Sequence, residues 1–177
     1  MERTPFLATH AAKPYEAIRT LPVTILLDNV RSMYNVGAFF RTADAAGVEK
    51  LLLGGITAQP PKHQISKTGL GAEERVGWKH SWEPAGLLRE LREHQYEIAA
   101  IETNPRSVDL YDWRPRFPVC VVFGHEVDGI QAGLLEMADT FVRIPMLGQK
   151  HSLNVATAGG VVIYELLRKY RVLMEAR

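Results

Sequence analysis

Short apolar runs alternate with amphipathic stretches along most of the chain. A run of apolar and β-branched residues with few polar interruptions is typical of a strand buried on both faces of a parallel sheet. Such runs lie at residues 23–27, 50–53, 96–101 and 118–123. Apolar positions at helical spacing predict helices at residues 36–46, 83–93 and 131–137. This alternation predicts an α/β fold with a mainly parallel sheet.

The end of the chain carries the longest predicted helix, at residues 153–167, after a strand that ends near Arg143. Apolar residues recur there at steps of three and four, at Val155, Ala158, Val162 and Leu166. Ser152 or Asn154 is placed to cap the first turn. The loop before this helix contains Pro145 and Gly148, and its irregular backbone must satisfy its polar groups with water, side chains or a ligand.

Two adjacent glycines, Gly159 and Gly160, lie inside this helix. Each costs about 1 kcal/mol relative to Ala in a helix interior, so the pair indicates that another backbone comes close. With Ala156 and Val161 they form a small-residue surface, and a closed twofold contact is the commonest way to bury such a face. The pattern predicts a homodimer through the C-terminal helix.

Composition and charge narrow the choice of function. A chain of 177 residues with 46% hydrophobic residues suits one domain whose core needs no disulfides. The lone Cys120 lies in an apolar run, so we expect a buried thiol in a reducing compartment. With 21 Lys+Arg against 20 Asp+Glu the formal charge is 21 − 20 = +1. Any nucleic-acid contact must therefore be local.

We expect residues 1–20 to form an arm and residues 21–177 to form the domain. No apolar stretch has the length of a signal peptide core or of a membrane span, which predicts a cytoplasmic protein without membrane contact. The loop after the first strand lacks the glycine patterns of dinucleotide-binding and phosphate-cradling loops. The scattered histidines show no spacing typical of metal ligands, so no metal is expected.

Basic and aromatic residues gather between residues 54 and 82, where the hydrophobic pattern weakens. The predicted RNA-binding residues are Arg31, Lys62, His63, Lys67 and Lys79. Trp78 and Trp82 lie among them. Ammonium groups beside aromatic faces suit the phosphates and bases of RNA. The same stretch is equally compatible with a solvated loop that contains two core tryptophans.

Three stretches in order resemble the signatures of the SpoU/TrmH-type RNA ribose 2′-O-methyltransferases of the SPOUT superfamily. The first is Asn-Val-Gly-Ala-Phe-Phe-Arg-Thr-Ala at residues 35–43, and the second is Val-Phe-Gly-His-Glu-Val-Asp-Gly at residues 122–129. The third runs from Arg-Ile-Pro-Met-Leu-Gly at residues 143–148 through Ser-Leu-Asn-Val at residues 152–155. Together they span nearly the whole chain.

The resemblance implies a six-stranded, mainly parallel sheet with helices on both faces and a C-terminal trefoil knot. It implies S-adenosylmethionine as the cofactor and an RNA ribose 2′-hydroxyl as the methyl acceptor. The cofactor-binding residues it implies are Thr103, Gly124, Ile144, Met146, Leu147, Ser152 and Leu153. The catalytic residues it implies are Asn35, Arg41, Glu126, Ser152 and Asn154.

The role of Arg41 and the substrate are the open points. Arginine side chains keep their proton in proteins, so we expect Arg41 to orient the acceptor hydroxyl or contact phosphate instead of acting as a base. The resemblance also places Arg41 of one subunit near the cofactor of the other. Transfer RNA is the expected substrate, with ribosomal RNA as the alternative. A catalytically inactive RNA-binding module and a small-molecule methyltransferase are the competing classes.

Overall fold

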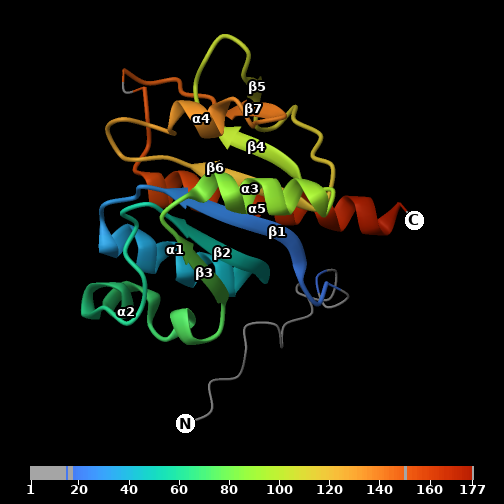
Figure 1. The fold of residues 1–177 in the computed structure, drawn as a ribbon. Coiled ribbons are helices and arrows are strands. Elements are labelled where there is room, and N and C mark those ends of the chain that lie inside the picture. Colours follow the sequence, from blue (N-terminus) through green and yellow to red (C-terminus); the bar gives the residue numbers. More distant parts are fainter. Residues whose placement is uncertain (1–14, 16–17, 150, 177) are drawn as a thin grey trace.

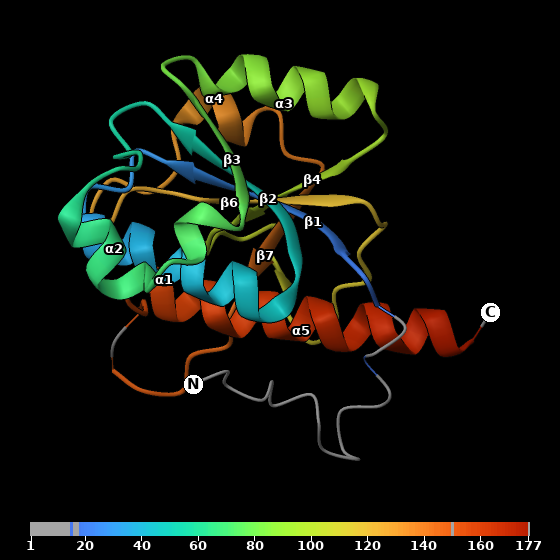
Figure 2. The same ribbon diagram turned by 90° about the horizontal axis from the view of Figure 1, so that it is seen from below.

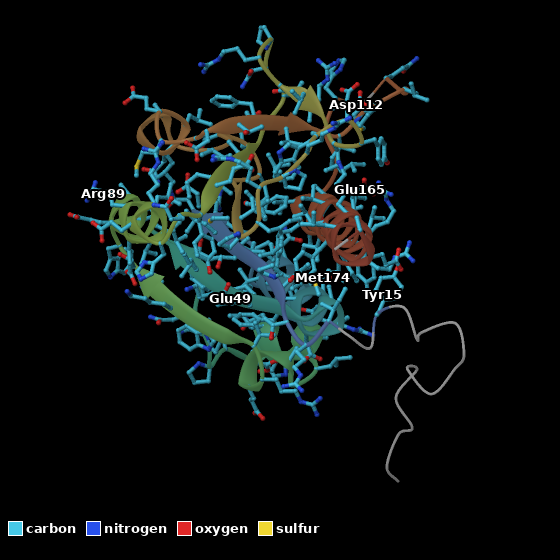
Figure 3. The ribbon with its side chains drawn as sticks, turned by 90° about the vertical axis from the view of Figure 1, so that its right-hand side faces the viewer. Tyr15, Glu49, Arg89, Asp112, Glu165 and Met174 are labelled. Carbon is cyan, nitrogen blue, oxygen red and sulfur yellow. The ribbon has the colours of Figure 1, made fainter. Side chains whose placement is uncertain are left out.

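The computed structural model describes residue 15, residues 18–149 and residues 151–176 (Figure 1). Most of the arm predicted at residues 1–20 lies outside the described residues. Tyr15 lies beside the C-terminal helix, where the Arg171 guanidinium is 5.4 Å from its ring centroid (Figure 3). Among the helices of this described part, none is both long and apolar enough to cross a membrane.

The sheet contains seven strands, and every pair of neighbours is parallel. In chain order they are β1 (Leu21–Asp28), β2 (Val48–Gly54), β3 (Gly77–Ser81), β4 (Glu97–Ile101), β5 (Val108–Asp109), β6 (Val119–Phe123) and β7 (Thr140–Arg143). Their order across the sheet is β3-β2-β1-β6-β4-β7-β5. The α/β prediction is confirmed, but the expected number of six strands is wrong.

Helices cover both faces of the sheet, as predicted (Figure 2). The helical segments are α1 (Met33–Ala46), α2 (His63–Gly69), the 3-10 turn η3 (Ala72–Glu74), α3 (Pro84–Glu93), α4 (Ala132–Leu135) and α5 (Val155–Glu175). Helices α1 and α5 lie on one face and α3 and α4 on the other, while α2 packs against the outside of α1. The trefoil knot stays a prediction.

Apolar residues fill both spaces between the sheet and its helices. On the α1 and α5 side, the Phe39 ring centroid lies 5.1 Å from that of Phe123 of β6. Val162, Ile163 and Leu166 of α5 are fully buried beside them. Cys120 is buried as predicted, and this burial raises the pKa of its thiol. A buried thiol that keeps its proton contributes to the core as an apolar packing group.

The two glycines of α5 have different surroundings. A Cβ atom at Gly159 would overlap the ring of Phe39, so the lack of a side chain at Gly159 makes room for Phe39 of the same chain. The expectation that a second backbone approaches Gly159 is therefore wrong. At Gly160 the added atom would meet open space among the described residues. Only this second glycine is available to a partner subunit.

Helix ends follow their capping residues. Gly47 ends α1 with a φ of 68°, as predicted, because a left-handed conformation suits glycine. The side chain of Asn154 caps α5, so of the two candidate caps Asn154 is right and Ser152 is wrong.

In the stretch between residues 54 and 82, where the hydrophobic pattern weakens, Trp78 is 37% exposed and Trp82 is 74% exposed. The alternative of two core tryptophans is therefore wrong.

Candidate functional site

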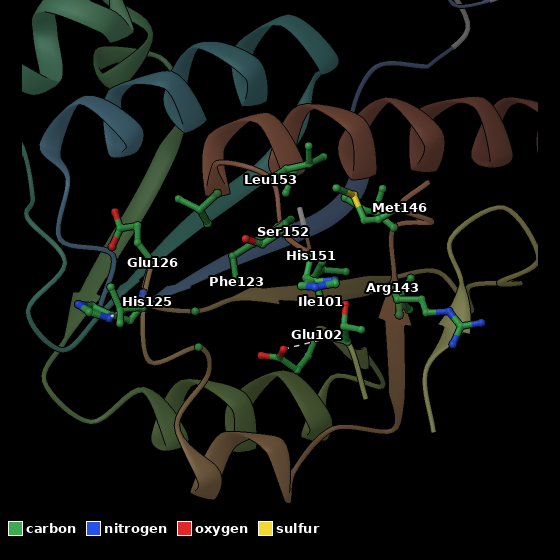
Figure 4. A pocket seen from close by; sticks show the side chains of 18 residues that line it. Ile101, Glu102, Phe123, His125, Glu126, Arg143, Met146, His151, Ser152 and Leu153 are labelled. Carbon is green, nitrogen blue, oxygen red and sulfur yellow. Dashed lines mark hydrogen bonds between the residues drawn. The ribbon is translucent and has the colours of Figure 1, made fainter. Parts of the chain in front are cut away.

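A pocket of about 280 Å³ opens where strands β4, β6 and β7 end (Figure 4). In parallel sheets, ligands bind outside the carboxyl ends of the strands, at the point where the strand order reverses. The apolar part of its wall contains Ile101, Phe123, Val142, Leu153 and Ala158. Segments far apart in the sequence therefore line one cavity, which the loop from β7 to α5 closes on one side.

A tight turn after β6 forms one edge of the pocket. The backbone N–H of His125 donates to the carbonyl of Gly129, and the N–H of Gly129 donates back, each at 3.0 Å. A Cβ atom at Gly124 would overlap the backbone of Gly129 and Ile130, so only glycine fits there. The His125 ring accepts hydrogen bonds from two further N–H groups inside the turn. The turn thus holds Glu126 in a fixed position.

Glu126 joins this turn to the start of α1. Its carboxylate accepts hydrogen bonds from the backbone N–H groups of Arg31 and Ser32, both at 3.1 Å. It also accepts one from the Asn35 side-chain amide at 3.0 Å. These donors lie at the amino end of a helix, where unpaired N–H groups and the helix dipole favour an anion.

The surroundings of Glu126 keep it ionised. Partial burial acts to raise the pKa of its carboxyl, but the hydrogen bonds from its own N–H, from Arg31, from Ser32 and from Asn35 outweigh burial and lower that pKa below its ordinary value. A carboxylate that stays charged at neutral pH and is held by these donors is suited to positioning other groups. It is poorly suited to donating a proton.

Asn154 extends this network to the start of α5. Its side-chain N–H donates to the Asn35 side-chain oxygen at 3.2 Å. Its own side-chain oxygen caps α5 by accepting from the N–H groups of Ala156 and Thr157, at 2.9 and 3.2 Å. Three of the predicted catalytic residues, Asn35, Glu126 and Asn154, therefore form one hydrogen-bonded cluster beside the pocket.

The other two predicted catalytic residues lie outside this cluster. Ser152 is exposed and lines the pocket. Arg41 is exposed on α1, more than one turn beyond Asn35, and makes no hydrogen bond or ion pair with any residue that the structure describes. Its side chain is therefore available to a substrate or to a second subunit.

Most of the predicted cofactor-binding residues line the pocket, namely Thr103, Gly124, Ile144, Met146, Ser152 and Leu153. Leu147 does not, and it is fully exposed. The sequence reasoning missed Glu102, whose carboxylate lies in the pocket and accepts a hydrogen bond from the Thr103 N–H at 3.0 Å. Its position directly after β4 could have identified it, since strand ends hold ligands in such sheets.

The predicted RNA-binding residues fall into two groups. Arg31 is exposed in the loop beside Glu126, and Lys62, His63 and Lys67 are exposed at α2, which packs on α1. The Lys67 ammonium is 6.0 Å from the ring centroid of Tyr34, the neighbour of Asn35. Lys79, in contrast, forms an ion pair at 3.1 Å with Glu90 of α3, on the opposite face. The single patch expected from the sequence is therefore divided.

No three His, Cys, Asp or Glu side chains gather to hold a metal ion within the described part of the chain. Arg143, a cationic side chain at the pocket rim, is paired with Asp109 at 2.5 Å. Glu102 makes no ion pair with any described residue. Among the described residues, neither of the two carboxylates that line the pocket, Glu102 and Glu126, is paired with a cation.

Comparison with known proteins identifies the family. A family model described as the SpoU rRNA Methylase family matches residues 22–164. The 23S rRNA (guanosine-2′-O-)-methyltransferase RlmB of Vibrio parahaemolyticus is 32% identical over 148 residues, which are 84% of this chain and 60% of that protein. A solved TrmH/SpoU tRNA modifying enzyme of A. aeolicus matches with a TM-score of 0.80 at 28% identity, over 88% of this chain and 78% of that one.

A solved AdoMet-bound rRNA methyltransferase from Sinorhizobium meliloti matches with a TM-score of 0.78 at 29% identity, over 82% of this chain and 56% of that one. Fold and pocket thus define a protein of the TrmH/SpoU structural class. The chain belongs to the SpoU rRNA Methylase family, which confirms the resemblance of the three signatures. It spans 59% and 60% of the lengths of two curated relatives.

Proposed function

We propose that this protein transfers a methyl group from S-adenosylmethionine to a ribose 2′-hydroxyl of RNA. The observation that carries the proposal is the cluster of Asn35, Glu126 and Asn154 beside the strand-end pocket. Residues of the three signature stretches meet at this one place. Asn35 and Glu126 are 91 residues apart in the sequence, and Asn35 and Asn154 are 119 residues apart. The names of the relatives agree, since they describe RNA methyltransferases.

The residues of the pocket fit the cofactor. Apolar side chains on several strand ends suit an adenine ring, and the Glu102 carboxylate suits the hydroxyls of a ribose, as acidic residues do in other nucleotide-binding sheets. The volume of about 280 Å³ is near the lower limit of about 300 Å³ for small-molecule sites. Bound S-adenosylmethionine would supply a methyl group on a sulfonium, ready for displacement.

The chain's own contribution is the position of the acceptor. In-line transfer needs the ribose oxygen, methyl carbon and sulfur in one line, and correct placement supplies most of the gain in rate. The Asn35 amide uses one N–H on Glu126 and one oxygen lone pair on Asn154. A second N–H and a second lone pair remain, because an amide has two of each. These can bind the acceptor hydroxyl, whose proton passes to solvent.

The preferred substrate is transfer RNA, and ribosomal RNA is the second candidate. The solved A. aeolicus relative, described as a tRNA modifying enzyme, favours the first, and the 23S rRNA enzyme of V. parahaemolyticus favours the second. Mapping of ribose methylation in a strain that lacks the gene distinguishes them. We expect one 2′-O-methyl group to disappear from a transfer RNA. Its loss from 23S RNA would assign the second candidate, and an unchanged pattern would contradict both.

A homodimer through α5 belongs to the same proposal, as does a cytoplasmic location. Tyr164 is 51% exposed on α5, and Gly160 leaves open space on this helix. Exposed Arg41 has no partner among the described residues, which suits a site completed by a second subunit. Light scattering of the purified protein should report a dimer at micromolar concentration. An active monomer would contradict this part of the proposal.

The proposal includes a cofactor site that needs no metal ion. Calorimetry with S-adenosylmethionine in the presence of a chelator should show the same affinity as without one. Loss of binding in chelator, restored by a divalent ion, would contradict the prediction.

A further inference from the structure

An exposed aromatic group lies at the carboxyl edge of the sheet, away from the pocket. Trp82 directly follows β3 and is 74% exposed. Its ring meets the His80 ring edge-on, with centroids 5.1 Å apart and planes at 84°. Ile56, in the loop after β2, is 58% exposed. We call Trp82, His80 and Ile56 the Trp82 platform.

Hydrogen bonds fix this platform to the sheet. His80 Nε2 lies 3.0 Å from the carbonyl oxygen of Gly55, and the Gly55 N–H donates to the Ser81 carbonyl at 2.9 Å. The N–H of Ile56 donates to the side-chain oxygen of Asn29 at 3.0 Å. A Cβ atom at Gly55 would overlap that Asn29 side chain, so the loop is closely fitted. His80 and Ile56 are therefore held in place, and His80 offers a fixed edge contact to the Trp82 ring.

The loop after β1, which contains Asn29, connects the platform to the proposed active site. Asn29 is followed by Arg31 and Ser32, whose N–H groups hold Glu126. Leu27 of β1 pairs in register with Phe123 of β6 on one side and with Leu53 of β2 on the other. Leu53 in turn pairs with His80 of β3. Three strand spacings of about 4.8 Å thus separate the turn after β6 from the platform, or about 15 Å. That length corresponds to about four stacked nucleotides at 3.4 Å each.

We propose that the Trp82 platform stacks an unpaired base of the bound RNA, a few nucleotides from the methylated ribose. The inference rests on the proposed function and names a contact through which unpaired RNA is held next to the proposed active site. Sequence-specific proteins bind RNA mostly at single-stranded loops, whose bases stack on aromatic side chains. Exposed cations, Arg31 in the intervening loop and Lys62 before α2, favour a polyanion over an apolar protein partner.

The test measures RNA affinity and its salt dependence together. The probe is a fluorescein-labelled single-stranded RNA of mixed sequence, about 16 nucleotides long, at the upper end of the site sizes of single-strand binders. Fluorescence anisotropy gives Kd at several salt concentrations for wild type, Trp82→Ala and Trp82→Phe. Tyr111→Ala is the matched control, since Tyr111 is 59% exposed beside β5 at the opposite edge of the sheet.

Stacking carries no charge, so Trp82→Ala should weaken binding about 5- to 100-fold and leave the salt slope unchanged. Trp82→Phe should recover most of the affinity, and Tyr111→Ala should match wild type. Lys67→Glu, in contrast, should flatten the slope. Calorimetry with S-adenosylmethionine confirms that each variant is folded.

Three results would overturn the inference while leaving methyl transfer intact. They are equal RNA affinity for Trp82→Ala and wild type, equal losses for Trp82→Ala and Tyr111→Ala, and a Trp82→Ala defect confined to self-association, which would indicate a protein interface. If wild type itself binds no RNA at low salt, the proposed function fails as well. The two failures are therefore distinguishable.

Discussion

Replacing Glu126 with glutamine tests the central contact of the site. The wild-type carboxylate accepts three hydrogen bonds, at 3.1, 3.1 and 3.0 Å. Glutamine keeps one acceptor oxygen and replaces the other with an amide that can only donate. At least one N–H at the start of α1 therefore loses its partner, and the remaining bonds lose the added strength of a charged acceptor.

The cost can be bounded from the structure. Hydrogen bonds to charged groups contribute about 1.5–3 kcal/mol and neutral ones about 0.5–1.5 kcal/mol. Because Glu126 is exposed, water replaces part of what is lost, so we expect Glu126→Gln to lower the free energy of unfolding by about 1 kcal/mol. Asn35 also loses a fixed partner, and misplacement of a reacting group costs about 100-fold in rate. Methyl transfer should fall accordingly.

The lowered pKa of Glu126 determines how the stability difference between wild type and Glu126→Gln changes with pH. The pKa of Glu126 is lowered in the folded protein, mainly by hydrogen bonds that outweigh burial, whereas an unfolded glutamate titrates near about 4.3. A lowered folded pKa means stability that is present above about pH 5 and lost as pH falls through the folded pKa. The difference in stability between wild type and Glu126→Gln should therefore shrink on acidification.

Urea denaturation of both proteins between neutral and acidic pH measures this difference. Glu136→Gln is the control, because Glu136 is exposed beyond α4 and makes no hydrogen bond through its side chain with a described residue. Its difference from wild type should stay near zero throughout. A stability difference for Glu126→Gln that does not change with pH would refute the reasoning, as would full methyl transfer by that variant.

Three further predictions follow from individual side chains. Gly159→Ala should lower the melting temperature, because overlap with Phe39 costs about 1–3 kcal/mol, more than the helix preference of alanine over glycine, about 1 kcal/mol, returns; a raised melting temperature would contradict this packing. Arg41→Ala should abolish methyl transfer with unchanged calorimetric affinity for S-adenosylmethionine, and Arg41→Lys with wild-type turnover would show that charge alone suffices. Glu102→Gln should weaken S-adenosylmethionine and 5′-methylthioadenosine equally, about tenfold for a loss of about 1.4 kcal/mol; an effect on S-adenosylmethionine alone would place the carboxylate at the ammonium group instead.

The fold was largely readable from the apolar runs. The run at residues 23–27 lies inside β1, and that at 118–123 matches β6, because both strands are buried on both faces. β3 was missed because its first three positions are exposed, so it shows no apolar run. β5 is only Val108–Asp109, and its pairing with β7 depends on tertiary contacts.

The site was readable only in part. The signatures identified Asn35, Glu126 and Asn154, but sequence separation hides that they share hydrogen bonds. The backbone donors to Glu126 have no sequence signal, because any residue offers an N–H. The cost of Gly159 in a helix was visible, whereas the group that fills its space, Phe39, comes from α1. That contact depends on how the two helices pack.

Methyl transfer by the purified protein tests the central claim most directly. The protein is incubated with methyl-labelled S-adenosylmethionine and with transfer RNA or ribosomal RNA from a strain that lacks the gene. The RNA is then digested to nucleosides. The account predicts label in a 2′-O-methylated nucleoside, from transfer RNA and only with intact Asn35. Label in a base, label only in small metabolites, or no incorporation into either RNA would contradict it.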